Sequence, residues 1–192
     1  MVKTSLRYGN SLTDQQLVEM SIRGDRQAFA EIVSRYESTV ARTVMGIVGS
    51  GAEAEDIGQD TFVRFYRSMA NFRWESSLRT YLTRIAINLA LNEVKKRKRV
   101  FSFFVRQDEE KELDVIDPHG VMERTDAADA VEKALQKLSP DFKTVITLRL
   151  IEGYSTKETA QILKLPVGTV LSRLSRAQAV LKKQVKLIMP EL

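Results

Sequence analysis

The chain of 192 residues has no cysteine and a single histidine, His119. Disulfides, thiol nucleophiles and the usual zinc sites built from Cys and His are therefore excluded. Its apolar stretches fall far short of the ~20 residues that a membrane-spanning helix needs, and residues 1–10 contain no apolar core of signal-peptide length. We therefore expect a cytoplasmic protein with no membrane insertion.

Glycine and proline are also scarce, with nine and four residues, and apolar residues recur at helical spacing rather than alternating as strands require. The sequence therefore predicts an all-α protein. In the first half we expect helices over about 13–23, 25–48, 52–69 and 78–99. Thr13 with Gln16 predicts a capping box at the first helix, and Ser76 or Ser77 is the expected cap of the fourth.

Two charged segments follow the fourth predicted helix. Residues 95–99 are five consecutive cations, whose repulsion disfavours a free helix but suits a phosphate-lined surface, so we expect the helix to end there. Residues 107–126 hold eight acidic and two basic side chains, which is typical of a flexible linker. The predicted organisation is two small helical domains joined by a flexible acidic linker, with boundaries at residues 1–100, 101–126 and 127–192.

The second half contains a helix-turn-helix pattern. Ser155 and Glu158 predict a capping box before a short helix, residues 164–166 form a turn, and a final helix follows. In this layout the second helix enters the major groove of DNA. No acidic residue occurs between Leu165 and Pro190, and the polar face of the final helix carries Arg, Ser and Thr. From periodicity alone, a helical hairpin with a solvated basic face remains an alternative.

Two stretches of sequence carry a family resemblance. Residues 165–170 (Leu-Pro-Val-Gly-Thr-Val) and 172–177 (Ser-Arg-Leu-Ser-Arg-Ala) closely resemble the segment with which extracytoplasmic-function (ECF) sigma factors of bacterial RNA polymerase recognise the minus-35 promoter element. Residues 54–62 resemble that family's polymerase-clamp-binding helix, and residues 72–76 with 85–88 resemble its minus-10 recognition segment. The resemblance implies a sigma-2-like four-helix domain and a sigma-4-like helix-turn-helix domain.

The resemblance also implies three groups of binding residues and no catalytic residue, metal or cofactor. The expected polymerase-binding residues are Asp56, Gln59 and Asp60. The expected minus-10 DNA-binding residues are Arg64, Phe72, Arg73, Trp74, Glu75, Ser76, Arg79, Asn88, Asn92 and Lys95. The expected minus-35 DNA-binding residues are Gly168, Thr169, Leu171, Ser172, Arg173, Ser175 and Arg176.

Physical chemistry supports these roles. Capture of bases that have left the stack needs an aromatic loop, amide side chains and nearby cations. Trp74 is suited to stack on a flipped base, and Asn88 to bond its edge. Leu171 stands where the family commonly has Arg or Lys; it can touch a thymine methyl or extend the apolar stripe, and the second is favoured. Without the resemblance, a packed Trp74, a satisfied Asn88 and a merely solvated acidic face remain open.

The expected partners are core RNA polymerase, promoter DNA and an anti-sigma factor. The acidic linker is expected to imitate nucleic acid in a basic channel of the polymerase. One alternative is a helix-turn-helix regulator that binds duplex DNA as a dimer without polymerase. Another is an enzyme that holds Mg²⁺ with Glu55, Asp56 and Asp60, although no phosphate-binding glycine-rich loop accompanies them.

Overall fold

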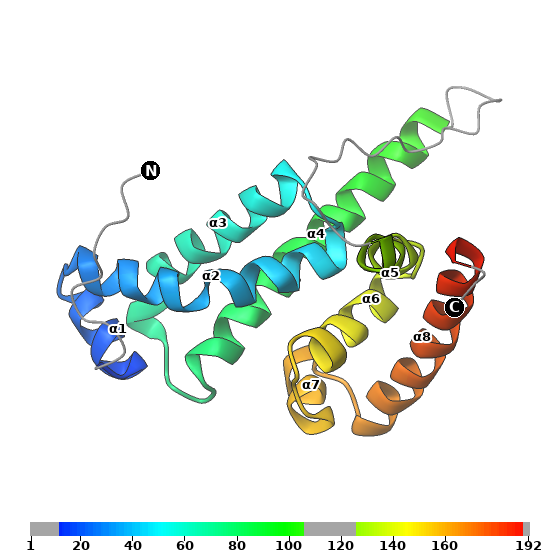
Figure 1. Ribbon diagram of the computed structural model, residues 1–192. Helices are drawn as coiled ribbons and strands as arrows, with labels where there is room; N and C mark the ends of the chain where they lie inside the picture. The colour runs from blue at the N-terminus through cyan, green and yellow to red at the C-terminus, as the bar shows by residue number, and fades with distance from the viewer. Residues whose placement is uncertain (1–11, 106–125, 190–192) are drawn as a thin grey trace.

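The computed structural model describes residues 12–105 and 126–189, and every element in these two ranges is a helix (Figure 1). The predicted all-α fold is confirmed. The elements of the first range are α1 (Asp14–Ile22), α2 (Arg26–Val48), α3 (Ala52–Ser68), the short 3₁₀ helix η2 (Met69–Asn71) and α4 (Leu78–Val105). Those of the second are α5 (Asp126–Gln136), α6 (Pro140–Ile146), the π-helical turn η3 (Thr147–Ile151), α7 (Thr156–Leu163) and α8 (Val167–Ile188). None of the helices in these ranges is long and apolar enough to cross a membrane.

Local capping signals place several helix starts. At α1 the Thr13 hydroxyl accepts the N–H of Gln16, and the Gln16 side chain accepts the N–H of Thr13 in return. Ser155 opens α7 in the same way. At α4 the Ser77 hydroxyl accepts the N–H of Thr80 at 3.2 Å, so Ser77, one of the two expected caps, begins this helix. Each cap satisfies an N–H group that has no partner inside its own helix.

The predicted end of α4 is wrong, because the helix continues through the five cations to Val105. Two ion pairs reduce the repulsion that was expected to stop it. Arg97 pairs with Glu53 of α3 and donates to the carbonyl of Val48, while the Lys96 ammonium lies 3.5 Å from the Glu93 carboxylate one turn earlier. The C-terminal end of α4 extends beyond the bundle (Figure 1). The predicted acidic linker, residues 107–126, lies outside the described residues except for its last residue, which begins α5.

The first domain has its core where α2 packs against α3 and α4, with α1 across one end of α2 (Figure 1). Leu17, Ile32, Val44, Phe65 and Leu82 are completely buried there. At roughly 1.5–3 kcal/mol for each fully buried apolar side chain, this interior dominates the stability of the domain. It also fixes the outward faces of α3 and α4.

The second domain has two smaller apolar clusters, both on α8. Residues of α5, α6 and α8 enclose the first, which includes Leu135, Ile146 and Ala177. Val145 of α6 and Val170 of α8 belong to the second, together with a residue of α7. The clusters hold α7 and α8 in a fixed helix-turn-helix geometry.

The two domains are in contact. Leu148, Tyr154 and Ile162 of the second domain belong to the same buried cluster as the core of the first. The Tyr154 and Thr83 hydroxyls are hydrogen-bonded at 2.9 Å inside this interface. Figure 1 shows α6 and α7 beside α2 and α4, in agreement with their contacts.

Candidate functional site

The acidic face of α3 is accessible. Asp56 and Gln59 are exposed, whereas Asp60 is half-buried and its carboxylate accepts from the Arg64 guanidinium at 3.1 Å. An expected polymerase-binding residue is thus paired with an expected DNA-binding residue. Because this i,i+4 pair is on the surface, it contributes only a few tenths of a kcal/mol and can exchange for other partners.

An apolar groove of about 350 Å³ borders the acidic face and was not predicted from the sequence. It lies between α2 and α3, and Gln59 is part of its wall. Its apolar lining includes Val33, Met45 and Phe62, of which Met45 is 37% exposed. A groove with acidic side chains at its edge suits a protein helix that carries both apolar and cationic residues. The apolar pattern of α2 was visible in the sequence, but it does not separate core positions from groove positions.

In the loop between α3 and α4, the indole ring of Trp74 lies against other aromatic side chains. Phe72 is half-buried, with its ring centroid 4.6 Å from that of Tyr81, so it anchors the loop to the core. The Trp74 ring lies 4.6 Å from that of Phe72 and is 38% exposed. Trp74 has a positive φ of 57°, a conformation that costs a non-glycine residue free energy and often accompanies function.

The remaining loop residues and α4 extend this surface. Arg73 and Glu75 are exposed and Ser76 is half-buried. Asn88, Asn92 and Lys95 are all exposed at positions i, i+4 and i+7 of α4, which places them along one side of the helix.

Arg79 does not fit the prediction of a free phosphate-binding cation. Its guanidinium donates to the backbone carbonyl of Glu152 at 2.6 Å and to the Glu152 carboxylate at 3.1 Å. It also lies 4.6 Å from the centre of the Tyr154 ring. Glu152 and Tyr154 belong to the Glu-Gly-Tyr-Ser segment of the second domain. No local sequence pattern indicates the contact between this segment and Arg79.

The helix-turn-helix has the predicted form. Lys164 ends α7 in the left-handed conformation with φ 54°, and α8 starts after Pro166. The exposed members of the expected minus-35 group are Gly168, Leu171, Ser172, Ser175 and Arg176, and the half-buried ones are Thr169 and Arg173.

Two of these residues differ from the simplest expectation. Leu171 is 52% exposed, so it does not extend the packed apolar stripe that we favoured for it. Arg173 pairs with Asp141 at the start of α6, with a nitrogen-to-oxygen distance of 3.1 Å. The exposed Leu171 side chain is free to touch a base methyl group, and Arg173 must release Asp141 to reach DNA.

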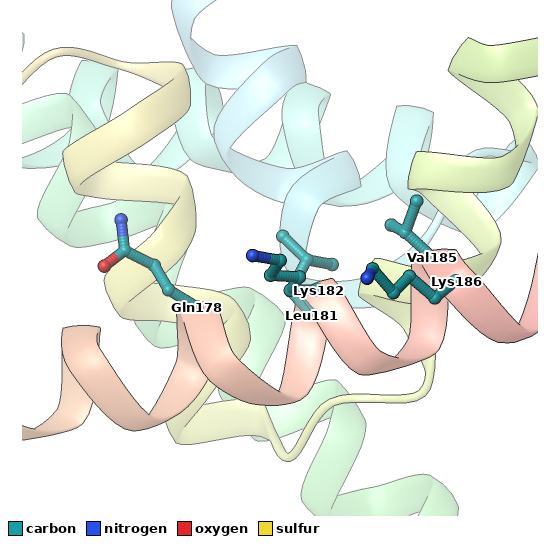
Figure 2. Close-up of a pocket in the computed structure, with 5 residues that line it drawn as sticks. All are labelled: Gln178, Leu181, Lys182, Val185 and Lys186. Carbon is teal, nitrogen blue, oxygen red and sulfur yellow. The ribbon is translucent and has the colours of Figure 1, made fainter. Parts of the chain in front are cut away.

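A second groove follows this face along α8. Figure 2 shows its five lining side chains on one side of the helix, and its volume is about 330 Å³. Leu181 and Val185 form its apolar part, and the exposed Lys182 and Lys186 accompany them. Since Leu181 also packs on the cluster between α5, α6 and α8, the groove is the open edge of that core.

Comparison with known proteins assigns the chain to a class. Residues 32–100 match the Sigma-70 region 2 family, and residues 128–179 match the family described as Sigma-70, region 4. A region 2 followed by a region 4 defines a two-domain sigma factor of the sigma-70 type.

Relatives and solved structures narrow the class. The RNA polymerase sigma-H factor of Pseudomonas aeruginosa is 35% identical over 93% of this chain and 96% of its own length, and the ECF RNA polymerase sigma-E factor of Haemophilus influenzae is 37% identical over 93% and 98%. CnrH, solved in complex with the cytosolic domain of CnrY, matches with a TM-score of 0.65 and 25% identity over 90% of this chain and 97% of CnrH. The sigma factor RpoE of Bartonella quintana, solved with the anti-sigma factor NepR, has the same fold, with a TM-score of 0.65 and 24% identity over 82% and 96%.

The chain belongs to the extracytoplasmic-function sigma factors of RNA polymerase. It is an RNA polymerase-binding, promoter-specific transcription initiation factor, and a regulator that acts without polymerase is not favoured. Sigma factors are transcription factors without catalytic activity.

Proposed function

We propose that the first domain, residues 1–100, binds core polymerase and recognises the minus-10 element, and that the second, residues 127–192, recognises the minus-35 element. The segment 101–126 connects them as a linker. The observation that carries this proposal is the arrangement of the first domain. A protein-binding face on α3 and a nucleic-acid-binding face on the Trp74 loop and α4 are held by one rigid core.

Core polymerase binds along α3. Asp56 and Gln59 offer acceptors to cationic side chains of the polymerase, and the groove between α2 and α3 accepts apolar ones. When Arg64 leaves Asp60 to contact DNA, the Asp60 carboxylate becomes available to the polymerase. This ion pair therefore links DNA binding to polymerase binding. The coupling is small because the pair is exposed.

Substitution of Asp56 tests this contact. Asp56→Ala is expected to weaken core binding by about tenfold or more, because a hydrogen bond to a charged group contributes roughly 1.5–3 kcal/mol. Glu19→Ala in α1 is the matched control, since it also removes one exposed carboxylate. Fluorescence titration of labelled protein with core polymerase measures both. Equal affinities for Asp56→Ala and the wild type would contradict the proposed polymerase face.

Minus-10 recognition uses the Trp74 loop and the exposed side of α4. Trp74 stacks on a base that has left the duplex, and Asn88 bonds its edge. Arg64, Arg79, Asn92 and Lys95 contact the phosphates. Phe72 acts as a support for Trp74, since its own ring is packed on Tyr81.

Minus-35 recognition uses the first turns of α8. Exposed side chains there include Leu171, Ser172, Ser175 and Arg176, and the half-buried Thr169 precedes them. Arg176 is suited to a guanine. Leu171 replaces a polar contact by an apolar one, which favours thymine at the base it faces.

The proposal also covers regulation by an anti-sigma factor and the opening of the DNA strands. CnrH and RpoE are each recorded with a bound protein, the cytosolic domain of CnrY and the anti-sigma factor NepR, and we extend this mode to an anti-sigma partner of the present chain. Base capture offsets an unpairing cost of a few kcal/mol, so no catalytic residue, metal or cofactor is required. The protein acts in the cytoplasm, where its polymerase is.

A further inference from the structure

We propose that Lys164, in the turn between α7 and α8, binds a DNA phosphate beside the minus-35 element and so anchors α8 in the major groove. The inference rests on the proposed function, because it takes α8 to be the helix that recognises this element. Lys164 is in none of the three groups of binding residues that the sequence predicted, and it adds a contact with the phosphate backbone.

The backbone of Lys164 has a conformation that favours glycine. Its φ of 54° and ψ of 45° lie in the left-handed region, and its N–H donates to the Ala160 carbonyl where α7 ends. A side chain at such a position costs free energy relative to glycine, which is the residue most often found where a helix ends in this way. The turn itself therefore gives no reason for a lysine.

The place of this strained residue in the fold points to DNA. In the two described ranges, the non-glycine residues with positive φ are Trp74 and Lys164. Trp74 lies in the loop assigned to the minus-10 element, and Lys164 lies in the turn of the helix-turn-helix. Unfavourable backbone conformations cluster at functional sites, so a binding role accounts for both residues.

Packing fixes the point from which the Lys164 side chain starts. Leu163 and Leu165, on either side of it, are half-buried and pack on the cluster that includes Val145 and Val170. Lys164 is exposed between them, and in the described part of the chain no carboxylate pairs with it. Its ammonium group is therefore available to a ligand next to the first turn of α8.

The first turns of α8 offer few cations for phosphate binding. Arg173 and Arg176 are the basic residues between Val167 and Ala177. The Arg173 guanidinium lies 3.1 Å from the Asp141 carboxylate, and Arg176 is assigned to a base. Half or more of the hydrogen bonds between proteins and DNA go to phosphates and sugars, so α8 needs a phosphate contact from outside these turns.

The geometry of a helix-turn-helix places Lys164 at the edge of the groove. The second helix enters the major groove with its N-terminal residues at the base edges. Lys164 precedes the start of α8 at Val167 by three residues, so it lies where the chain reaches the groove, which phosphates border. A lysine acts there as a point charge that binds a phosphate whatever the base sequence.

The salt dependence of DNA binding tests for this contact. The parent protein and Lys164→Gln, each bound to core polymerase, are titrated at several salt concentrations with two fluorescent duplexes. One duplex carries the minus-35 sequence that the protein selects in run-off transcription, and the other has a mixed sequence. We expect Lys164→Gln to reduce the slope of log affinity against log salt concentration by about 0.9, and to weaken binding about eightfold at roughly 0.1 M salt.

Two further variants control for charge and position. Lys164→Arg should keep the slope of the parent, because it keeps the positive charge. Lys133→Gln is the matched control, since Lys133 is an exposed lysine of α5 outside the helix-turn-helix, and it should also keep that slope. Equal slopes for Lys164→Gln and the parent overturn the proposal.

Lys164→Gly separates DNA binding from a role in the fold. Glycine relieves the left-handed strain, so the melting temperature of the full-length protein should rise by about 2 °C while DNA binding weakens as in Lys164→Gln. Thermal unfolding measures the first effect and the same titration measures the second. A fall in both stability and affinity would mean that the lysine serves the turn, and it would overturn the proposal.

Arg176→Ala distinguishes this proposal from the proposed function. Lys164→Gln should weaken binding to both duplexes by the same factor, whereas Arg176→Ala should reduce the preference for the minus-35 duplex. A reduced slope in Lys164→Gln with an unchanged preference in Arg176→Ala would support the phosphate contact and reject minus-35 recognition by α8. The parent slope in Lys164→Gln with a lost preference in Arg176→Ala would do the reverse.

Discussion

Trp74 combines exposure, aromatic support and an unfavourable backbone conformation. A tryptophan with φ 57° is held there by its surroundings, in this case by Phe72 and the start of α4 at Ser77. Such strain at an aromatic residue that is 38% exposed points to a role in binding rather than in stability.

Replacement of Trp74 tests its role. Trp74→Ala is expected to reduce transcript yield from a duplex promoter by about 5- to 160-fold, since stacking of one base contributes roughly 1–3 kcal/mol. Trp74→Phe should retain much of the yield. Run-off transcription with core polymerase measures the effect, and thermal unfolding verifies that the fold is unchanged. Wild-type yield from Trp74→Ala would show that this ring captures no base.

The packing of helix α6 against helix α4 creates the environment of the Lys143 side chain. Burial first, and then Arg97 and Lys98, lower its pKa from the usual 10.5 to about 8. Since the unfolded chain binds this proton more tightly, the penalty is fully present below pH 8 and disappears as pH rises toward 10.5. Folding stability should therefore increase with pH across this window.

Lys143→Met should raise stability at pH 7 by about 1–2 kcal/mol, because relief of a penalty of up to roughly 3 kcal/mol is partly offset by loss of the hydrogen bond to Gln136. The gain over the wild type should shrink by about 2 kcal/mol at pH 9.5. Urea unfolding at both pH values measures this, with Lys137→Met as an exposed control. A gain that does not depend on pH would exclude the titration of Lys143 as its cause.

Helix starts were predictable from the sequence, and one helix end was not. The capping signals at Thr13 and Ser155 act over three residues, so the local sequence contains all the participants. The end of α4 depends on Glu53, which is 44 residues from its partner Arg97, and a local rule of like-charge repulsion does not include it.

At the scale of the molecule, the sequence predicted the two helical domains and offered candidate binding residues, but it did not indicate how the domains meet. The contact of Glu152 with Arg79 joins residues 73 positions apart, and Gly46 of α2 leaves room for a distant threonine side chain of the second domain. Both contacts cross the interface between the domains, and the hydrophobic periodicity of the sequence carries no information about them. Asn88 and Arg176 are exposed, whereas Arg79 and Arg173 have acidic partners that the sequence did not indicate.

The most direct test of the central claim is genome-wide run-off transcription with purified core polymerase from the source bacterium, with and without the protein. We expect a defined set of new start sites, preceded by shared minus-10 and minus-35 sequences that report the selection made by Trp74 and Leu171. Asp56→Ala, which weakens core binding, should reduce the transcript yield at every site of the set. Absence of new start sites together with no binding to core polymerase would contradict the account.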